Sequence, residues 1–396
     1  MNELYELVKA NGTQPAPAAR FYAYSGIALY ESCVRGMNTH QSLEGQLQAL
    51  PDVPEPFNQV YHWPSVVNRC MAVMASSQFP GDQAQIDALE DSFDLTFDAT
   101  VAAAVRLRSA VYGESVANAI LAWAATDGQA TLAACGSAFV PPVVDGPWSG
   151  TGTGDFPCWS ALRPFVVTDA IECRPGQPPF FFTLPTTEWY AEALQIYFLT
   201  GDAGASLNPQ KIEIANYWDD APTTTGTPTG HWLGIVGVVT RDIPANNRLD
   251  IAAEAFARAG IAAADAFITC WYTKYDKYLQ RPVTYIQANI DSDWTPLLAM
   301  PNHPTYTSEH ATQAAAIAQA LTDMFGPTAF VDTTHTDLNP ELGYVDRYFD
   351  NFLVAAQEAA SGRLFAGAHY AFDTSEGFNS GVCVGNVLNA GLQFLK

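Results

Sequence analysis

The chain has 396 residues, of which 48% are hydrophobic, so it can bury a large core as one big domain or as two joined halves. Its 41 acidic residues outnumber the 18 basic ones, and the formal net charge of -23 argues against nucleic acid and anionic membrane as partners, because both need a basic surface. We see no membrane-spanning apolar run and no signal peptide, and expect a secreted or periplasmic protein, with a cytoplasmic one as the alternative.

Helical periodicity dominates the chain. In the first half, apolar residues recur at helical spacing over Ala19–Gly36, Ser92–Ala125 and Glu188–Leu199. Between about Cys135 and Pro185, proline and glycine interrupt this pattern, which indicates loop. Further along, the sequence predicts helices over residues 210–220, 229–239, about 247–281, 308–325, about 340–365 and about 377–395.

Few stretches alternate as strands do, and the sequence contains no repeat. We therefore predict an all-α fold of two helical bundles that are joined by the loop-rich middle segment. The first bundle, with its loops, would cover about residues 15–200, and the second, about residues 205–396, would carry the functional site. Both would belong to a single domain that spans residues 1–396.

The seven cysteines show no metal-ligand spacing such as Cys-x-x-Cys. Cys158 and Cys173 flank a proline-rich loop, so they are the pair that we expect to form a disulfide in an oxidising compartment. We interpret the others as small buried hydrophobic residues. Their odd number leaves the redox compartment open.

One turn carries two histidines. Residues 301–326 read PNHPTYTSEHATQAAAIAQALTDMFG, with His303 and His310 on either side of a Thr-Ser-Glu turn that opens an alanine-rich helix. The backbone N–H groups at a helix start form a ready anion site. Such a site also needs positive charge, of which this chain has little.

The positive charge that could serve this turn lies in two other segments. Lys274 and Arg281 are seven residues apart, which places them on one face of a helix, and Arg363 precedes His369 by six residues. Taken alone, each pair is typical of a solvated face, and His310 of a core histidine. Together these groups could surround a tetrahedral oxyanion, because arginine matches oxyanion geometry and lysine supplies a point charge.

Three segments stand in a fixed order. Lys274–Pro282 reads Lys-x6-Arg-Pro, Thr307–His310 reads Thr-Ser-Glu-His, and Ser361–His369 reads Ser-Gly-Arg-x5-His. They resemble the signature Lys-x6-Arg-Pro, Pro-Ser-Gly-His and Ser-Arg-x5-His of the vanadium-dependent haloperoxidases and the related type-2 phosphatidic acid phosphatases. The resemblance covers roughly residues 15–395, loosely in the first half and more specifically in the second.

The resemblance implies a vanadate cofactor, in a site that phosphate can also occupy. His369 would bond vanadium through its imidazole, and His310 would be the acid–base group at the apical oxygen. The remaining vanadate oxygens would be held by Lys274, Arg281, Arg363, the Ser308 hydroxyl and the backbone N–H of Glu309.

Two carboxylates would support this site. Asp220, or with less support Asp219, would pair with an arginine of the anion site. Asp373 lies four residues after His369 and would orient its imidazole, as carboxylates do for ligating histidines; a helix-end cap is the alternative.

The implied activity is the oxidation of a halide by hydrogen peroxide to a hypohalous species that halogenates a small organic substrate. His303 occupies a position that is histidine in algal bromoperoxidases and phenylalanine in fungal chloroperoxidases, so bromide and iodide are favoured over chloride. Trp271, three residues before Lys274, is expected near this position, with a core aromatic as the alternative. The expected catalytic residues are His310, His369, Lys274 and His303.

Three other functions stay open. An acid phosphatase on the same scaffold would use His369 as its nucleophile, since phosphate and vanadate share charge and shape. A degenerate oxyanion-binding protein would lack activity, and a cofactor-free enzyme would rearrange the skeleton of its substrate. The sequence leaves the oligomeric state open.

Glu309 replaces the glycine of the family signature. At about 4 Å, its carboxylate would repel an oxyanion by about 4 kcal/mol at an effective dielectric of about 20, so Glu309→Gly is expected to strengthen vanadate binding. We expect Glu309 either to face solvent from the first helical turn or to act as a functional group that binds peroxide or pairs with Lys277.

The remaining histidines carry weaker signals. His231 resembles a family position near the entrance of the site, with an ordinary helix-start histidine as the favoured interpretation. His40, His62 and His335 are expected to be loop or surface residues without a role.

Overall fold

The computed structural model describes residues 1–200 and 208–396. Among these residues, none of the helices is both long and apolar enough to cross a membrane. The helices and strands are α1 Asn2–Ala10, α2 Pro15–Val34, α3 Trp63–Gln78, α4 Gln83–Asp98, α5 Ala103–Ala124, α6 Leu132–Ala138, α7 Glu188–Leu199, α9 Pro209–Tyr217, α10 Thr227–Asp242, α11 Leu249–Lys277, α12 Pro282–Asn289, α13 Glu309–Phe325, β1 Phe330–Asp332, α14 Thr334–Leu338, β2 Arg347–Phe349, α15 Phe352–Phe365 and α16 Ala371–Gly391.

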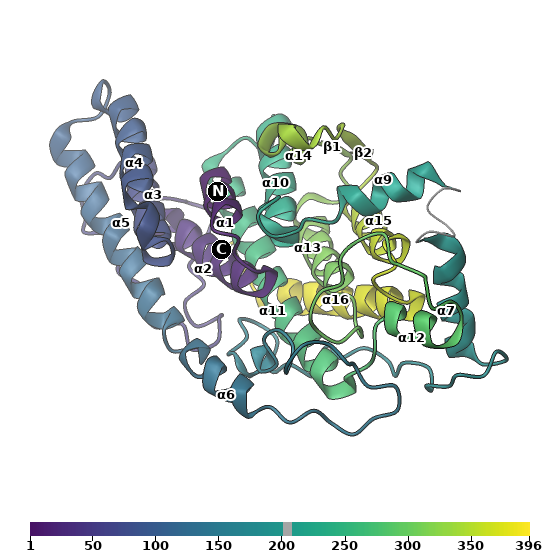
Figure 1. Cartoon of the computed structure of the whole chain (residues 1–396). Helices are drawn as coiled ribbons and strands as arrows, with labels where there is room; N and C mark the ends of the chain where they lie inside the picture. The colour runs from purple at the N-terminus through teal and green to yellow at the C-terminus, as the bar shows by residue number, and fades with distance from the viewer. Residues whose placement is uncertain (201–207) are drawn as a thin grey trace.

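The predicted all-α class is confirmed, since β1 and β2 form one short antiparallel pair beside the helices. The long helix α11 lies at the centre, between α2 on one side and α13 on the other, and α16 packs along α13 (Figure 1). On the far side of α2, helices α3, α4 and α5 form an arm. A continuous hydrophobic core includes residues of α2, α5, α11, α13 and α16. The division of the chain into two bundles stays a prediction.

Glycines let the central helices approach closely. A Cβ atom at Gly26 of α2 would lie 2.7 Å from the carbonyl oxygen of Phe256, and one at Gly260 of α11 would lie 2.9 Å from the Cα of Ala23. Real Cβ atoms are not found at such distances, so glycine is required at these crossings. Because α11 is fixed in this way, the groups at its C-terminal end have a defined position.

Several helix boundaries differ from those predicted. The helix expected to reach about residue 281 ends at Lys277, because Tyr278 adopts a left-handed conformation with a φ of 51°. The helix expected from about residue 340 begins at Phe352, where the side chain of Asn351 accepts a hydrogen bond from the backbone N–H of Val354. The last helix begins earlier than expected, at a capping box between Tyr370 and Asp373.

The predicted disulfide between Cys158 and Cys173 is wrong. Cys158 is bonded to Cys135, with their Cα atoms 6.1 Å apart, and Cys173 to Cys383 of α16, with Cα atoms 5.6 Å apart. Proximity in sequence does not determine connectivity, because the loop after α6 folds so that its two cysteines meet different partners. Of the five cysteines expected to be small buried hydrophobic residues, Cys33, Cys70 and Cys270 are free and buried. The expectation is wrong for Cys135 and Cys383, which form disulfides and are not buried.

Removal of the disulfide that closes the longer loop is expected to destabilise the protein more. The Cys173–Cys383 bond joins residues 210 positions apart and the Cys135–Cys158 bond residues 23 apart, so the first restricts the unfolded chain more strongly. Cys383→Ser should lower the free energy of unfolding by about 4–5 kcal/mol and Cys135→Ser by about 3 kcal/mol. Urea unfolding of both variants measures these values, and a smaller loss in Cys383→Ser would contradict the expected order.

Candidate active site

Lys274 and Arg281 meet through a turn and not, as expected, on one face of a continuous helix. Lys274 lies in the last turn of α11, and the left-handed residue Tyr278 then reverses the chain, so that Arg281 becomes the residue before α12. Both side chains are buried. Pro282 at the first position of α12 needs no hydrogen-bond partner for its nitrogen, which fits the start of a helix.

Lys274 is held by the loop that precedes α13. Its Nζ donates hydrogen bonds to the carbonyl oxygens of Pro304 (3.1 Å), Thr305 (3.0 Å) and Thr307. Burial lowers the pKa of Lys274, because a charged ammonium loses its hydration there. The backbone of residues 304–307 therefore fixes the position of a buried positive charge.

Arg281 connects two histidines. Its Nη1 donates to Nε2 of His369 (3.0 Å), and its Nη2 donates to Nδ1 of His303 (3.0 Å). Its other hydrogen bonds go to the carbonyl oxygens of Ala368 (2.9 Å) and His303 (3.0 Å). Burial lowers the pKa of Arg281 to about 10, so the guanidinium stays charged at neutral pH. Since arginine is always a donor, both ring nitrogens that it contacts must be acceptors.

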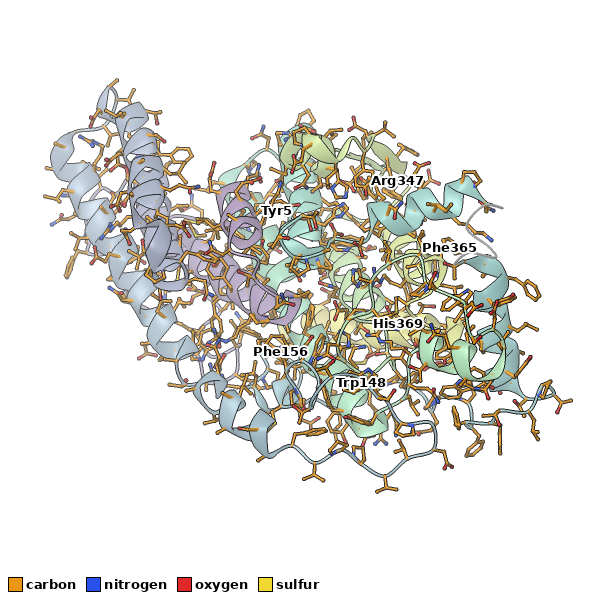
Figure 2. The ribbon with its side chains drawn as sticks, in the orientation of Figure 1. Tyr5, Trp148, Phe156, Arg347, Phe365 and His369 are labelled. Atoms are coloured by element: carbon orange, nitrogen blue, oxygen red, sulfur yellow. A yellow bond between two sulfur atoms is a disulfide. The ribbon has the colours of Figure 1, made fainter. Side chains whose placement is uncertain are left out.

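His369 has a defined tautomer. It lies in the segment between α15 and α16, inside the body of helices and away from the arm (Figure 2). Its Nδ1 donates to Oδ2 of Asp373 (3.0 Å), which leaves the lone pair on Nε2. Burial, followed by the charges of Arg281 and Lys274, lowers the pKa of His369 well below its usual value. The imidazole is therefore neutral, as a ligand or nucleophile must be.

Asp373 is a shared acceptor. Its Oδ2 receives hydrogen bonds from the Thr305 hydroxyl, from His369 and from the backbone N–H of Tyr370 (3.1 Å). The sequence suggested that Asp373 either orients the imidazole of His369 or caps a helix. Its carboxylate does both, because it contacts the imidazole and also caps α16. Burial raises the pKa of Asp373.

The start of α13 has the predicted form. Ser308 is the N-cap residue, and its Oγ accepts a hydrogen bond from the backbone N–H of Ala311 (3.4 Å). The first backbone N–H groups of a helix lack intrahelical acceptors, so those of Glu309 and His310 are suited to an anion. The close packing of α16, in which a Cβ atom at Gly377 would lie 2.9 Å from the Ser308 carbonyl oxygen, holds this helix start in place.

Glu309 neither faces solvent nor pairs with Lys277. Its side chain is buried, with Oε2 at 3.3 Å from Nε2 of His303 and Oε1 at 3.7 Å from Nδ1 of His310. Lys277 pairs instead with Asp276 (2.9 Å). Burial alone would raise the pKa of Glu309, but the contact with His303 and the charge of Lys274 hold it below its usual value. A negative charge therefore lies beside the proposed acid–base histidine.

The arginine partner is Asp219 and not Asp220, the residue that the sequence favoured. Nη1 of Arg363 donates to Oδ1 of Asp219 (3.3 Å), and the carbonyl oxygen of Asp219 lies 3.2 Å from Nε2 of His310. Asp220 has a left-handed backbone with a φ of 48°, which turns its side chain toward His231 (2.9 Å). Adjacent residues in a turn point to different partners, and the sequence alone does not distinguish them.

His231 is the centre of a buried ion network and not an ordinary helix-start histidine. Its Nδ1 and Nε2 contact carboxylate oxygens of Asp220 (2.9 Å) and Asp332 (2.8 Å), and its ring stacks on Trp218. Burial would lower the pKa of His231, but the two carboxylates raise it to about 10. Ligand atoms of Asp220, His231 and His335 lie within 4.8 Å of one another, yet both His231 nitrogens are engaged by carboxylates, so a metal would have to displace these bonds.

The three histidines expected in loops or at the surface differ from one another. His335 lies in α14 and is buried, with Nε2 at 2.8 Å from the carbonyl oxygen of Tyr217, so the expectation is wrong for it. His40 lies in the loop between α2 and α3, as expected, but it is buried and contacts Glu254 (3.1 Å). His62 is half-buried just before α3 and contacts Ser65 (2.9 Å). Single histidines in apolar surroundings give no sequence signal for their burial.

A cavity of about 300 Å³ opens next to these groups. Its lining includes both expected halide-site residues, Trp271 and His303, whose ring centroids lie 5.1 Å apart. Four residues that line it carry a buried polar atom with no hydrogen-bond partner among the residues that the structure describes: Asp220 Oδ1, Glu309 Oε2, His310 Nδ1 and Arg363 Nε. The cavity therefore offers both donors and acceptors to a small polar molecule.

The sequence did not reveal all of the residues around the site. Thr305 bonds Asp373 and also contacts Nδ1 of His369 (3.3 Å), but a threonine in a loop carries no distinguishing pattern. Asp332 is also unmarked, because it lies more than a hundred residues after its partner His231.

The chain is similar to one family model and to several solved structures. A family model described as the VCPO second helical-bundle domain matches residues 254–394. No curated protein sequence matches the chain significantly. A solved structure of the first bacterial vanadium-dependent iodoperoxidase is 29% identical, with a TM-score of 0.88 over 99% of this chain and 94% of that one.

Two structures of bacterial vanadium-dependent chloroperoxidase are more distant. The holo-type structure is 14% identical, with a TM-score of 0.75 over 96% of this chain and 92% of that one, and the apo-type structure is 14% identical, with a TM-score of 0.73 over 95% and 93%. At this identity they show the shared fold. The family model covers the part of the chain that contains Lys274, Arg281, Ser308, Arg363 and His369, and the similarity to the iodoperoxidase extends over nearly the whole chain.

Proposed function

We propose that the protein uses vanadate to oxidise a halide with hydrogen peroxide, producing a hypohalous species that halogenates a small organic substrate. The observation that carries this proposal is the state of His369. Its imidazole is neutral, Asp373 holds its Nδ1, and its Nε2 lone pair lies within a group of buried cations. The related bacterial iodoperoxidase is vanadium-dependent, which supports the same cofactor here.

The residues present fit vanadate. Lys274, Arg281 and Arg363 supply three buried positive charges, and Nε of Arg363 is a buried donor without a hydrogen-bond partner among the described residues. The N-terminus of α13 adds Ser308 and free backbone N–H groups. We propose that these groups hold the vanadate oxygens and that Nε2 of His369 bonds vanadium. Phosphate, with the same charge and shape, would be held by the same groups.

Bound vanadate supplies Lewis acidity that activates peroxide toward attack by halide. The protein residues hold and orient the reactants around it. His310 lines the cavity with a neutral ring, since burial and then the charge of Arg363 lower its pKa to about 3. We assign it the role of accepting a proton from the incoming peroxide. Lys274 and Arg281 stabilise negative charge that develops on oxygen.

We propose that bromide and iodide are preferred to chloride. His303 and Trp271 line the cavity beside Glu309, and the related iodoperoxidase supports an easily oxidised halide. Burial, and then the charge of Lys274, lower the pKa of His303 to about 3, so its ring is neutral and carries no charge to balance that of Glu309. Larger halides give up their hydration more readily and are favoured by such a site.

We further propose that the protein functions in an oxidising compartment, outside the cytoplasm. Two disulfides are present, which is typical of secreted and periplasmic proteins and rare in cytosolic ones. The net charge of -23 is consistent with such a location.

The test is halogenation of a reporter dione by dialysed protein with hydrogen peroxide, with and without orthovanadate. We expect product with iodide and bromide, less with chloride, and none without orthovanadate. Hydrolysis of a generic phosphomonoester without halogenation would favour a phosphatase with His369 as nucleophile. Failure to retain either vanadate or phosphate would indicate a degenerate oxyanion-binding protein.

A further inference from the structure

Glu309 and His310 present two acceptor atoms to each other with no proton between them. Nε2 of His310 lies 3.2 Å from the carbonyl oxygen of Asp219, and because a carbonyl only accepts, Nε2 must carry the proton. The lone pair of this neutral ring is then on Nδ1, which lies 3.7 Å from Oε1 of Glu309. Two facing lone pairs in a buried site are unfavourable unless a donor joins them.

His303 does not supply the donor that Glu309 and His310 lack. Nδ1 of His303 lies 3.0 Å from Arg281, which can only donate, and 3.2 Å from the carbonyl oxygen of Pro304. The shorter contact assigns the proton of His303 to Nε2, at 3.3 Å from Oε2 of Glu309. This contact has the distance of an ion pair but not the alignment of a hydrogen bond, and Oε2 has no hydrogen-bond partner among the described residues. Nδ1 of His310 likewise has none, and both side chains are about 5% exposed.

The cavity that both residues line is suited to one small neutral donor. Its volume is about 300 Å³, and its acidic lining also includes Asp155 and Asp219. Anions are disfavoured beside these carboxylates, whereas a neutral molecule with two O–H groups can donate to Glu309 and to His310 at once. Hydrogen peroxide has this chemistry and is the oxidant of the proposed function.

We propose that Glu309 is a further catalytic residue, which binds neutral hydrogen peroxide together with His310. One O–H group of peroxide donates to the Glu309 carboxylate and the other to Nδ1 of His310. An O–H bond of peroxide then breaks, an N–H bond forms at Nδ1, and the hydroperoxide anion moves toward the cations Lys274, Arg281 and Arg363. The Glu309 carboxylate stabilises the imidazolium that results. This proposal rests on the proposed function.

The role explains why a carboxylate is tolerated where the family signature has glycine. The buried charge is costly by itself, but Lys274 and the His303 N–H face it and lower the pKa of Glu309. The benefit of the carboxylate would be a lower KM for hydrogen peroxide. By contrast, the carboxylate should weaken the binding of any anion, which includes the halide and vanadate.

The experiment compares Glu309→Gln, Glu309→Gly and the control Asp155→Asn, which removes another carboxylate from the same cavity. In the vanadate-loaded enzyme, we expect the KM for hydrogen peroxide to rise at least about tenfold in both Glu309 variants, since a hydrogen bond to a charged group is lost. The KM for iodide should stay unchanged or fall. The control should change the KM for hydrogen peroxide less than about twofold, and its KM for iodide should stay unchanged or fall, since it too removes a carboxylate from the cavity. An unchanged KM for peroxide in Glu309→Gln would overturn the proposal.

A second measurement uses the protein without vanadate. With ¹⁵N-labelled histidine, hydrogen peroxide should shift the Nδ1 resonance of His310 in the wild type and in Asp155→Asn, and not in Glu309→Gln. Absence of the shift in the wild type would overturn the peroxide site even if halogenation occurs. If halogenation fails but the shift is present, the proposed function fails and the peroxide site stands. Thermal unfolding of each variant establishes that it is folded.

Discussion

Replacement of His369 by alanine is expected to abolish vanadate retention and to reduce halogenation by about a thousandfold or more. Nε2 of His369 is the only direct bond to vanadium that the proposed site provides, and charge alone would have to hold the ion in its absence. Losses of this size occur when one member of a catalytic unit is removed. Equilibrium dialysis against orthovanadate measures retention independently of turnover.

Asp373→Asn separates ligation from orientation. The asparagine still fits between Thr305 and His369 but no longer offers a charged acceptor to Nδ1. We expect vanadate affinity to fall by about 10–100-fold, as is typical when the partner of a ligating histidine is changed. His62→Gln, outside the site, serves as the control and should bind vanadate normally.

Retention of vanadate by His369→Ala at wild-type affinity would refute the assignment of His369 as ligand.

Periodicity is enough to predict the fold class, and the order of the three motifs is enough to predict that Lys274, Arg281 and Arg363 lie near His369. Helical spacing identified the α11 and α13 segments, because their buried faces repeat with the period of a helix. It failed where local conformation overrides pattern. Tyr278 ends α11 in a left-handed conformation, which glycine usually adopts, so the sequence does not signal this helix end. Arg281 therefore reaches the site from a turn.

Side-chain partners were harder to predict than side-chain positions. Asp219 and Asp220 are neighbours in sequence, and only the backbone conformation of the turn assigns one to Arg363 and the other to His231. For Glu309 the sequence identified a conflict between a carboxylate and an anion site. The structure places the side chain against His303 and His310, which depends on contacts between α13 and a distant loop.

Asp332→Asn is expected to destabilise the protein strongly, although it lies away from the anion site. His231 is fully buried, and its imidazolium is balanced by Asp220 and Asp332. Removal of one partner leaves an undercompensated buried charge, which typically costs about 3–5 kcal/mol. Urea unfolding measures the loss. Asp242→Asn, which breaks an exposed pair with Arg241, is the control and should cost less than about 1 kcal/mol.

The pH dependence of this loss identifies the charge on His231. The two carboxylates raise the pKa of His231 to about 10, so its contribution to stability is complete below its unfolded pKa of about 6.5 and is lost as the pH rises through about 10. Burial would raise the pKa of Asp332, but the charge of His231 and the hydrogen bonds from His231 and Thr334 lower it to about 2. The contribution of Asp332 to stability is therefore present above about pH 4 and is lost as the pH falls through about 2.

The difference in unfolding free energy between wild type and Asp332→Asn should therefore be greatest near pH 5–6 and should shrink toward pH 10. A difference that does not vary between pH 6 and 10 would mean that His231 is neutral. The network also bears on catalysis, because it holds Asp220 in its left-handed conformation, and the neighbouring residue Asp219 contacts Arg363 and His310. Loss of Asp332 should thus weaken vanadate binding without any change in a residue that touches the ion.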